Sequence, residues 1–140
     1  MSEKAAMSEQ SWIPEPSEAT APFFEGARKG KLRLQRCAAC GTWGFPPMSR
    51  CTGCGSADIE WANASGRGTV YSHALLQRPY HPRHQGRLPL VLAQVDLPEG
   101  VRVMTNLVDV DPEAVRVGDA VVVTFERFAD GGVLPVFKPA

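Results

Sequence analysis

The stretches Cys37-Ala38-Ala39-Cys40-Gly41 and Cys51-Thr52-Gly53-Cys54-Gly55 decide the fold of the N-terminal part of this chain. They are two matched CxxCG motifs, and they contain all four cysteines of the sequence. Ten residues lie between Cys40 and Cys51, so the pattern is C-x2-C-x10-C-x2-C. This spacing brings four thiolates around one tetrahedral ion, and zinc is the ion that such a set favours. The predicted ligands are Cys37, Cys40, Cys51 and Cys54.

The zinc prediction competes with three other uses of the cysteines. Iron also suits a tetrahedral thiolate site of the rubredoxin type. Two disulfides need an oxidising compartment, but residues 1–10 are mostly polar and do not resemble a secretory signal. A redox CxxC motif normally occurs once, beside a βαβ pattern. Because four bound thiolates leave no open position for water, we expect a structural metal rather than a catalytic one.

The charge of the chain is balanced overall. Its 15 basic and 15 acidic residues give a formal net charge of zero. A nucleic-acid-binding surface normally has an excess of positive charge, which this balance does not supply. The longest apolar runs, such as residues 90–93, are too short to span a bilayer. We therefore expect a soluble, cytoplasmic protein.

Hydrophobic periodicity predicts a mostly β chain with one short helix. The segment from Pro22 to Gly30 begins and ends with residues that are typical of the two ends of a helix. Alternating and β-branched segments predict strands, and residues 110–115 predict a capped helical turn. The predicted strands are residues 31–36, 59–61, 69–76, 90–97, 101–107, 121–128 and 136–138.

These elements predict three consecutive parts. Residues 1–21 are rich in Ser, Glu, Ala and Pro and predict a flexible N-terminal arm. Residues 22–62 predict a helix followed by a four-cysteine zinc ribbon, in which the metal substitutes for a large apolar core. Residues 63–140 predict a five-stranded Greek-key barrel of the OB-fold type.

Several further segments make the chain resemble the DUF35 family, whose members join a rubredoxin-like zinc ribbon to an OB-fold. The resemblance extends, in order, from about Phe23 to Ala140. The matching N-terminal segments are Phe24-Glu25-Gly26, Gly30-Lys31-Leu32, Gln35-Arg36-Cys37, Phe45-Pro46-Pro47 and Trp61, followed by Gly66-Arg67-Gly68. The later ones are Arg78-Pro79, His81-Pro82, Leu88-Pro89, Met104-Thr105-Asn106-Leu107, Val117-Gly118 and Leu134-Pro135-Val136-Phe137.

The resemblance implies that this chain associates with an enzyme. Members of this family are typically small subunits or domains that associate with thiolase-like or lipid-transfer-type acyl-CoA enzymes, such as aldolases and thiolases, or with MaoC-like enoyl-CoA hydratases. It therefore implies a non-catalytic, zinc-binding accessory subunit that assists acyl-CoA binding, and we predict no catalytic residue in this chain. Because OB barrels also bind single strands, a single-stranded nucleic-acid-binding protein is the alternative.

The candidate ligand-binding segment is the long loop at residues 77–89. It lies within residues 67–95, which contain no acidic residue and all three histidines. Arginine binds the phosphates of coenzyme A by charge-assisted hydrogen bonds, and a tyrosine ring stacks on adenine. The alternative is a solvated loop whose arginines pair with the acids of the C-terminal third. The candidate residues are Arg78, Tyr80, His81, Arg83, His84 and Arg87.

The segment between the two CxxCG motifs is rich in aromatic residues and proline. We expect it to stack over the metal site and to replace the core that the ribbon lacks. The alternative is an exposed tip that contacts a partner protein. The residues concerned are Trp43, Phe45, Pro46 and Pro47.

Overall fold

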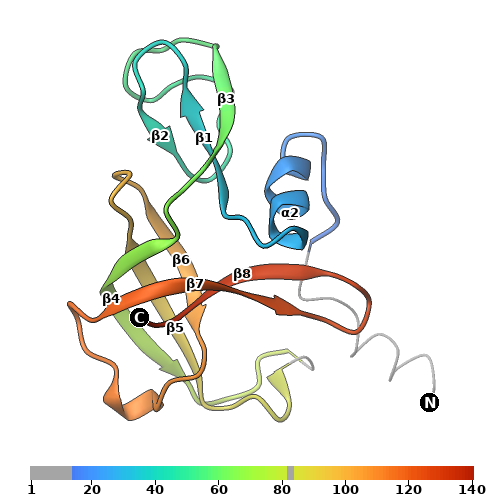
Figure 1. Cartoon of the computed structure of the whole chain (residues 1–140). Coiled ribbons are helices and arrows are strands. Elements are labelled where there is room, and N and C mark those ends of the chain that lie inside the picture. The colour runs from blue at the N-terminus through green and yellow to red at the C-terminus, as the bar shows by residue number, and fades with distance from the viewer. Residues whose placement is uncertain (1–13, 82–83) are drawn as a thin grey trace.

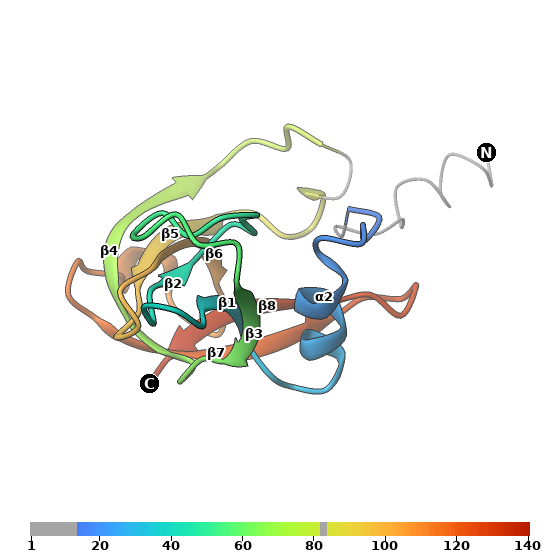
Figure 2. The same ribbon diagram turned by 90° about the horizontal axis from the view of Figure 1, so that it is seen from above.

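The computed structural model describes residues 14–81 and 84–140, and in them a ribbon of three short strands stands on a closed barrel of five (Figure 1). Helix α2 (Ala21–Arg28) precedes the ribbon and contacts strands of both parts, beside which it lies in Figure 2. Pro22 lies in its first turn, and Gly30 follows it with a φ of 73°, a conformation that ends a helix. The predicted mostly β fold with one short helix is confirmed. Residues 1–13 of the predicted arm lie outside the described residues.

The ribbon is an antiparallel sheet in the order β2-β1-β3. Its strands are β1 (Arg33–Cys37), β2 (Trp43–Gly44) and β3 (Ile59–Asn63). Strand β1 is central: Cys37 pairs with Ile59 at one end, and Arg33 pairs with Asn63 at the other. The first cysteine therefore lies at the end of the central strand, and both CxxCG turns extend from the end of the ribbon farther from the barrel (Figure 1).

The barrel has the strand order β4-β5-β6-β8-β7, with a parallel pair between β6 and β8. The predicted five-stranded barrel is confirmed, and the predicted capped turn is the 3-10 segment η2 (Pro112–Ala114), which Asp111 caps by accepting from Glu113 N. The last strand is longer than predicted because it pairs with β7 along its whole length. The strands are β4 (Arg67–Leu76), β5 (Leu90–Asp96), β6 (Arg102–Leu107), β7 (Ala120–Arg127) and β8 (Val133–Pro139).

One apolar cluster joins the ribbon to the barrel. Leu32 and Leu34, from the start of the ribbon, are buried in the same cluster as the barrel residues Val95, Val121 and Phe137. The ribbon therefore depends on the barrel for apolar packing at its base and on its cysteines at its far end. Burial of a leucine side chain contributes roughly 1.5 to 3 kcal/mol, so this contact fixes the base of the ribbon firmly.

The connection from ribbon to barrel is short and tightly bonded. Ser65 N donates to Glu99 Oε2 at 2.7 Å, which ties the connection to the turn between β5 and β6. Gly66 has a φ of 77°, and a Cβ atom there would lie 2.6 Å from Val123 Cγ1. Its carbonyl accepts from Val123 N at 2.7 Å. Glycine is required here because both the backbone conformation and the contact with β7 exclude a side chain.

Candidate functional site

The four cysteine sulfurs converge at the far end of the ribbon, and all lie within 4.8 Å of one another. Cys37 Sγ lies 3.7 Å from Cys54 Sγ, and Cys40 Sγ lies 3.5 Å from Cys51 Sγ. A tetrahedral ion with Zn–S bonds of about 2.3 Å requires sulfurs about 3.8 Å apart, which these separations approach. The geometry therefore fits zinc, and the four predicted ligands form one site.

The glycines that follow the cysteine pairs make the turns possible. Gly41 and Gly55 have φ angles of 82° and 79°, and each donates its N–H to the carbonyl of the first cysteine of its motif, at 2.8 and 2.9 Å. In the second turn, the N–H groups of Gly53 and Cys54 also lie 3.2 and 3.4 Å from Cys51 Sγ. These N–H groups stabilise the thiolate form of Cys51, as zinc binding requires.

Hydrogen bonding shifts the pKa values of the cysteine thiols in opposite directions. Contacts with the side chain and then the backbone of Thr42 lower the pKa of Cys40 to about 6. The backbone of Ser56 favours the Cys54 thiolate, but the sulfurs of Cys40 and Cys37 outweigh it and raise the pKa of Cys54 to about 12. Four thiolates this close repel one another, so a bound cation is needed for all of them to ionise. Because the four sulfurs fill a tetrahedral shell, the chemistry that zinc supplies here is structural.

The aromatic residues between the two motifs pack at the base of the ribbon. Trp43 and Phe45 are half-buried and pack against the apolar cluster at the base of the ribbon. The ring of Phe45 lies 5.8 Å from that of Phe23 on helix α2, so it joins the ribbon to the helix. Pro46 is exposed and Pro47 is half-buried. Trp43 and Phe45 therefore add apolar packing at the base of the ribbon, and a cover over the cysteines stays a prediction.

Within the loop at residues 77–89, Arg87 has a partner in the barrel. Its guanidinium donates to Glu126 Oε2 of β7 at 2.6 Å, and both side chains are mostly buried. The guanidinium carbon also lies 5.9 Å from the centre of the Phe128 ring. Arg87 therefore anchors the loop to β7, which agrees with the alternative in which a loop arginine pairs with an acid of the C-terminal third.

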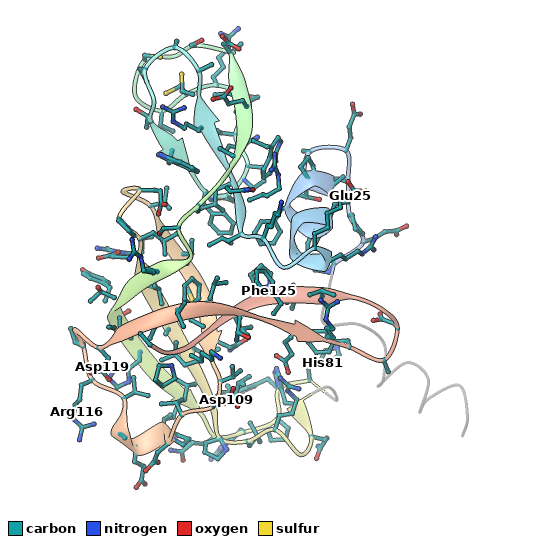
Figure 3. The ribbon with its side chains drawn as sticks, viewed as in Figure 1. Glu25, His81, Asp109, Arg116, Asp119 and Phe125 are labelled. Carbon is teal, nitrogen blue, oxygen red and sulfur yellow. The ribbon has the colours of Figure 1, made fainter. Side chains whose placement is uncertain are left out.

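Three other candidates in the loop are more exposed than Arg87. Tyr80 is 76% exposed, and Arg78 and His81 are also exposed. His84 Nδ1 accepts from His81 N at 3.2 Å, so the two histidines shape the tip of the loop. Figure 3 shows His81 at the lower part of the barrel, well away from the ribbon. Arg83, predicted as a sixth member, lies outside the described residues.

A hollow of about 480 Å³ lies at the foot of this loop. Leu75, Leu88 and Pro112 supply apolar lining, and Asp111 and Glu113 supply carboxylates. Carboxylates disfavour an anionic ligand, so this hollow does not suit the phosphates of coenzyme A. Local sequence patterns did not predict the hollow, since its lining comes from three segments that are separated in sequence.

Two family models match consecutive parts of the chain. The model described as "ChsH2, rubredoxin-like zinc ribbon domain" matches residues 24–60, and "ChsH2, C-terminal OB-fold domain" matches residues 61–126. A "DUF35 domain-containing scaffold protein" of Methanothermobacter thermautotrophicus is 32% identical, over 72% of this chain and 76% of its own length. The chain belongs to the DUF35 family. The resemblance inferred from the sequence is confirmed, and with it the ribbon and the OB-fold.

Other relatives of this DUF35 chain have names that refer to acyl-CoA enzymes. A "Probable enoyl-CoA hydratase alpha subunit" of Thermomonospora curvata is 42% identical over 84% of this chain, and the chain spans 36% of the length of that relative. "Benzoylsuccinyl-CoA thiolase subunit BbsA" of Thauera aromatica is 28% identical, over 82% of this chain and 72% of its own length. The chain thus spans little more than one third of the first of these relatives.

A solved structure shares the whole architecture of this DUF35 chain. The structure titled "Ltp2-ChsH2(DUF35) aldolase" matches with a TM-score of 0.82 and 39% identity, over 91% of this chain and 98% of the other. Within the part of the DUF35 chain that the structure describes, no helix has the length and apolar character needed to cross a membrane.

Proposed function

We propose that this chain is a zinc-binding accessory subunit of an acyl-CoA enzyme. Its partner is a thiolase-like or lipid-transfer-type enzyme, or an enoyl-CoA hydratase. The observation that carries the proposal is the match to the DUF35 part of an aldolase complex along nearly the whole of both chains. The names of the hydratase and thiolase relatives support the same class of partner.

The arrangement of the site supports a role in assembly rather than in catalysis. Four cysteines complete the shell of the metal, so zinc has no position for a substrate or a reactive water. The ribbon is fixed to the barrel at one end by apolar packing and held at the other by the cysteines, and it forms a rigid projection. A rigid projection suits a docking surface, since little conformational freedom is lost when a partner binds.

The loop at residues 77–89 contributes to acyl-CoA binding in this proposal. Arg78 provides a charge-assisted hydrogen bond for a phosphate, and exposed Tyr80 provides a ring for adenine. His81 and His84 add possible donors in the same loop, and Arg83 stays a predicted member of the set. Arg87 has a different role, because its guanidinium is bonded to Glu126 and fixes the base of the loop.

The test uses the chain co-expressed with a thiolase-like or hydratase subunit from the same organism. We expect the two proteins to co-elute as one complex that binds acetyl-CoA, measured by calorimetry. Arg78→Ala should weaken acetyl-CoA binding at least fivefold. Arg116→Ala is the control, since Figure 3 shows Arg116 and His81 on different sides of the barrel. A wild-type chain that elutes alone, or that binds short single-stranded RNA tightly at physiological salt, would refute the proposal.

A further inference from the structure

The outer face of strands β4, β5 and β6 forms a patch whose composition is unusual for a solvent-exposed sheet. The strand register places Ser72, Gln94 and Met104 in one row across the three strands. Ala74, Leu92 and Asn106 form the next row, because Ala74 pairs with Leu92 and Leu92 pairs with Asn106. We call these six residues, together with Tyr71, Asp96 and Arg102, the β4–β6 face.

This face exposes large apolar side chains around a shallow groove. Met104 is 68% exposed and Tyr71 is 47% exposed, although the rest of the barrel buries most of its large apolar residues. A groove of about 310 Å³ runs between the strands, and its lining includes Ala74, Leu92 and Met104. Methionine, tyrosine and arginine are the residues enriched at the centres of protein interfaces, which points to a protein as the occupant.

Two pairs of polar side chains on the face already bond to each other. Arg102 donates to both carboxylate oxygens of Asp96, at 2.6 and 3.1 Å, and its guanidinium carbon lies 3.3 Å from the centre of the Tyr71 ring. The hydrogen bond from Arg102 lowers the pKa of Asp96, so the pair stays ionised and mutually neutralised. Ser72 Oγ donates to Gln94 Oε1 at 2.9 Å.

Because these polar side chains are paired with each other, burying the face under a partner costs less desolvation free energy. A partner that buries it leaves no charge without a counter-charge and breaks few hydrogen bonds to water, whose loss otherwise opposes association. The arrangement also argues against an oligonucleotide, which OB-folds bind on this side of the barrel. The charged group there that would attract phosphate is Arg102, and it is bonded to Asp96 and stacked on Tyr71.

We propose that the β4–β6 face docks the acyl-CoA enzyme subunit, through an uncharged, apolar surface of that subunit whose protruding side chain enters the groove beside Met104. The charge balance of the face selects this occupant, since an acidic or a basic surface would meet no complementary charge. This inference rests on the proposed function, because it names a barrel surface that takes part in that assembly in addition to the ribbon.

The experiment compares Met104→Lys with Val117→Lys in the co-expressed complex. Val117 is a matched control because it is 67% exposed and lies in the turn before β7, outside the cross-strand rows of the face. We expect Met104→Lys to weaken assembly at least tenfold, measured from the dissociation of the purified complex on dilution. Val117→Lys should change the affinity less than twofold. Zinc content and the melting temperature should remain those of wild type in both variants, because both side chains point into solvent.

The outcomes separate this inference from the proposed function. If wild type fails to assemble with any acyl-CoA enzyme subunit, the proposed function is wrong. If wild type assembles and Met104→Lys binds as tightly as wild type, or Val117→Lys loses as much affinity, the assignment to the β4–β6 face is wrong and the proposed function stands. A concentration-dependent dimer of the isolated chain that Met104→Lys abolishes would instead assign the face to a second copy and overturn the inference. Protection of β4 to β6 from hydrogen exchange in the complex would support it.

Discussion

Replacing Arg87 with alanine should destabilise the fold more than it affects acyl-CoA binding. The Arg87 guanidinium lies 2.6 Å from Glu126 Oε2, and the two side chains are 31% and 24% exposed. At this distance the Coulomb attraction is roughly 6 kcal/mol for an effective dielectric constant of 20. Desolvation of the two ions offsets most of that attraction. The burial of this pair is intermediate between two classes of ion pair. Exposed pairs contribute about 0.2 to 1 kcal/mol to the free energy of unfolding, and disruption of buried pairs costs about 3 to 5 kcal/mol.

We therefore expect Arg87→Ala to lower the free energy of unfolding by about 1 to 2 kcal/mol. For a chain of this length, that loss lowers the melting temperature by about 3 to 7 °C. The assay is thermal unfolding of the zinc-loaded protein, followed by circular dichroism. Arg78→Ala is the control: Arg78 is an exposed arginine of the same loop, and its loss should change the stability by less than about 0.5 kcal/mol.

A double-mutant cycle with Glu126→Ala decides whether the pair is responsible. In the Glu126→Ala background, Arg87→Ala should cost much less than it does in wild type, because its counter-charge is already absent. An unchanged melting temperature for Arg87→Ala, or an equal loss in both backgrounds, would refute the argument that Glu126 holds the loop. A loss of acetyl-CoA affinity without a loss of stability would return Arg87 to the binding residues.

Three further outcomes can be measured on the isolated chain. Cys51→Ser should reduce the bound zinc well below about one equivalent per chain, measured by atomic emission, because three sulfurs hold the ion more weakly than four; full retention would exclude Cys51 as a ligand. Zinc should dissociate as the pH falls and not as it rises, because the cysteines bind as thiolates and protonation removes a ligand; a chelator titration across pH checks this sign. Gly66→Ala should lower the free energy of unfolding by about 1 to 3 kcal/mol, because of its positive φ and its contact with Val123; a stabilised variant would contradict that contact.

The local features of this protein were predictable from its sequence. The CxxCG motifs place each pair of sulfurs within one turn, so Cys37, Cys40, Cys51 and Cys54 were identified as a set before any fold was known. The five barrel strands and the capped turn at η2 follow from alternating residues and from the capping residue Asp111, which are properties of neighbouring positions.

Contacts between distant segments were beyond the sequence patterns. The loop composition pointed to arginines that bind an anion, but nothing in residues 77–89 shows that Glu126, 39 positions after Arg87, lies within hydrogen-bond distance. The rings of Trp43 and Phe45 were expected over the cysteines. In the structure they pack against the apolar cluster at the base of the ribbon. In both cases a partner from another element decides the role of the residue.

The sequence by itself determined the ligands of the metal site and the approximate positions of the strands, because both depend on spacings of a few residues. The β4–β6 face was decided by the tertiary structure. A shift of register between Val70 and Ser72 places Ser72 and Ala74 in the same rows as Gln94 and Leu92. Side chains alternate between the two faces of a strand, so such an irregularity changes which residues point outward. The exposure of β4 follows strict alternation from Val70 to His73 and departs from it at Ala74, which is exposed where alternation predicts a buried residue.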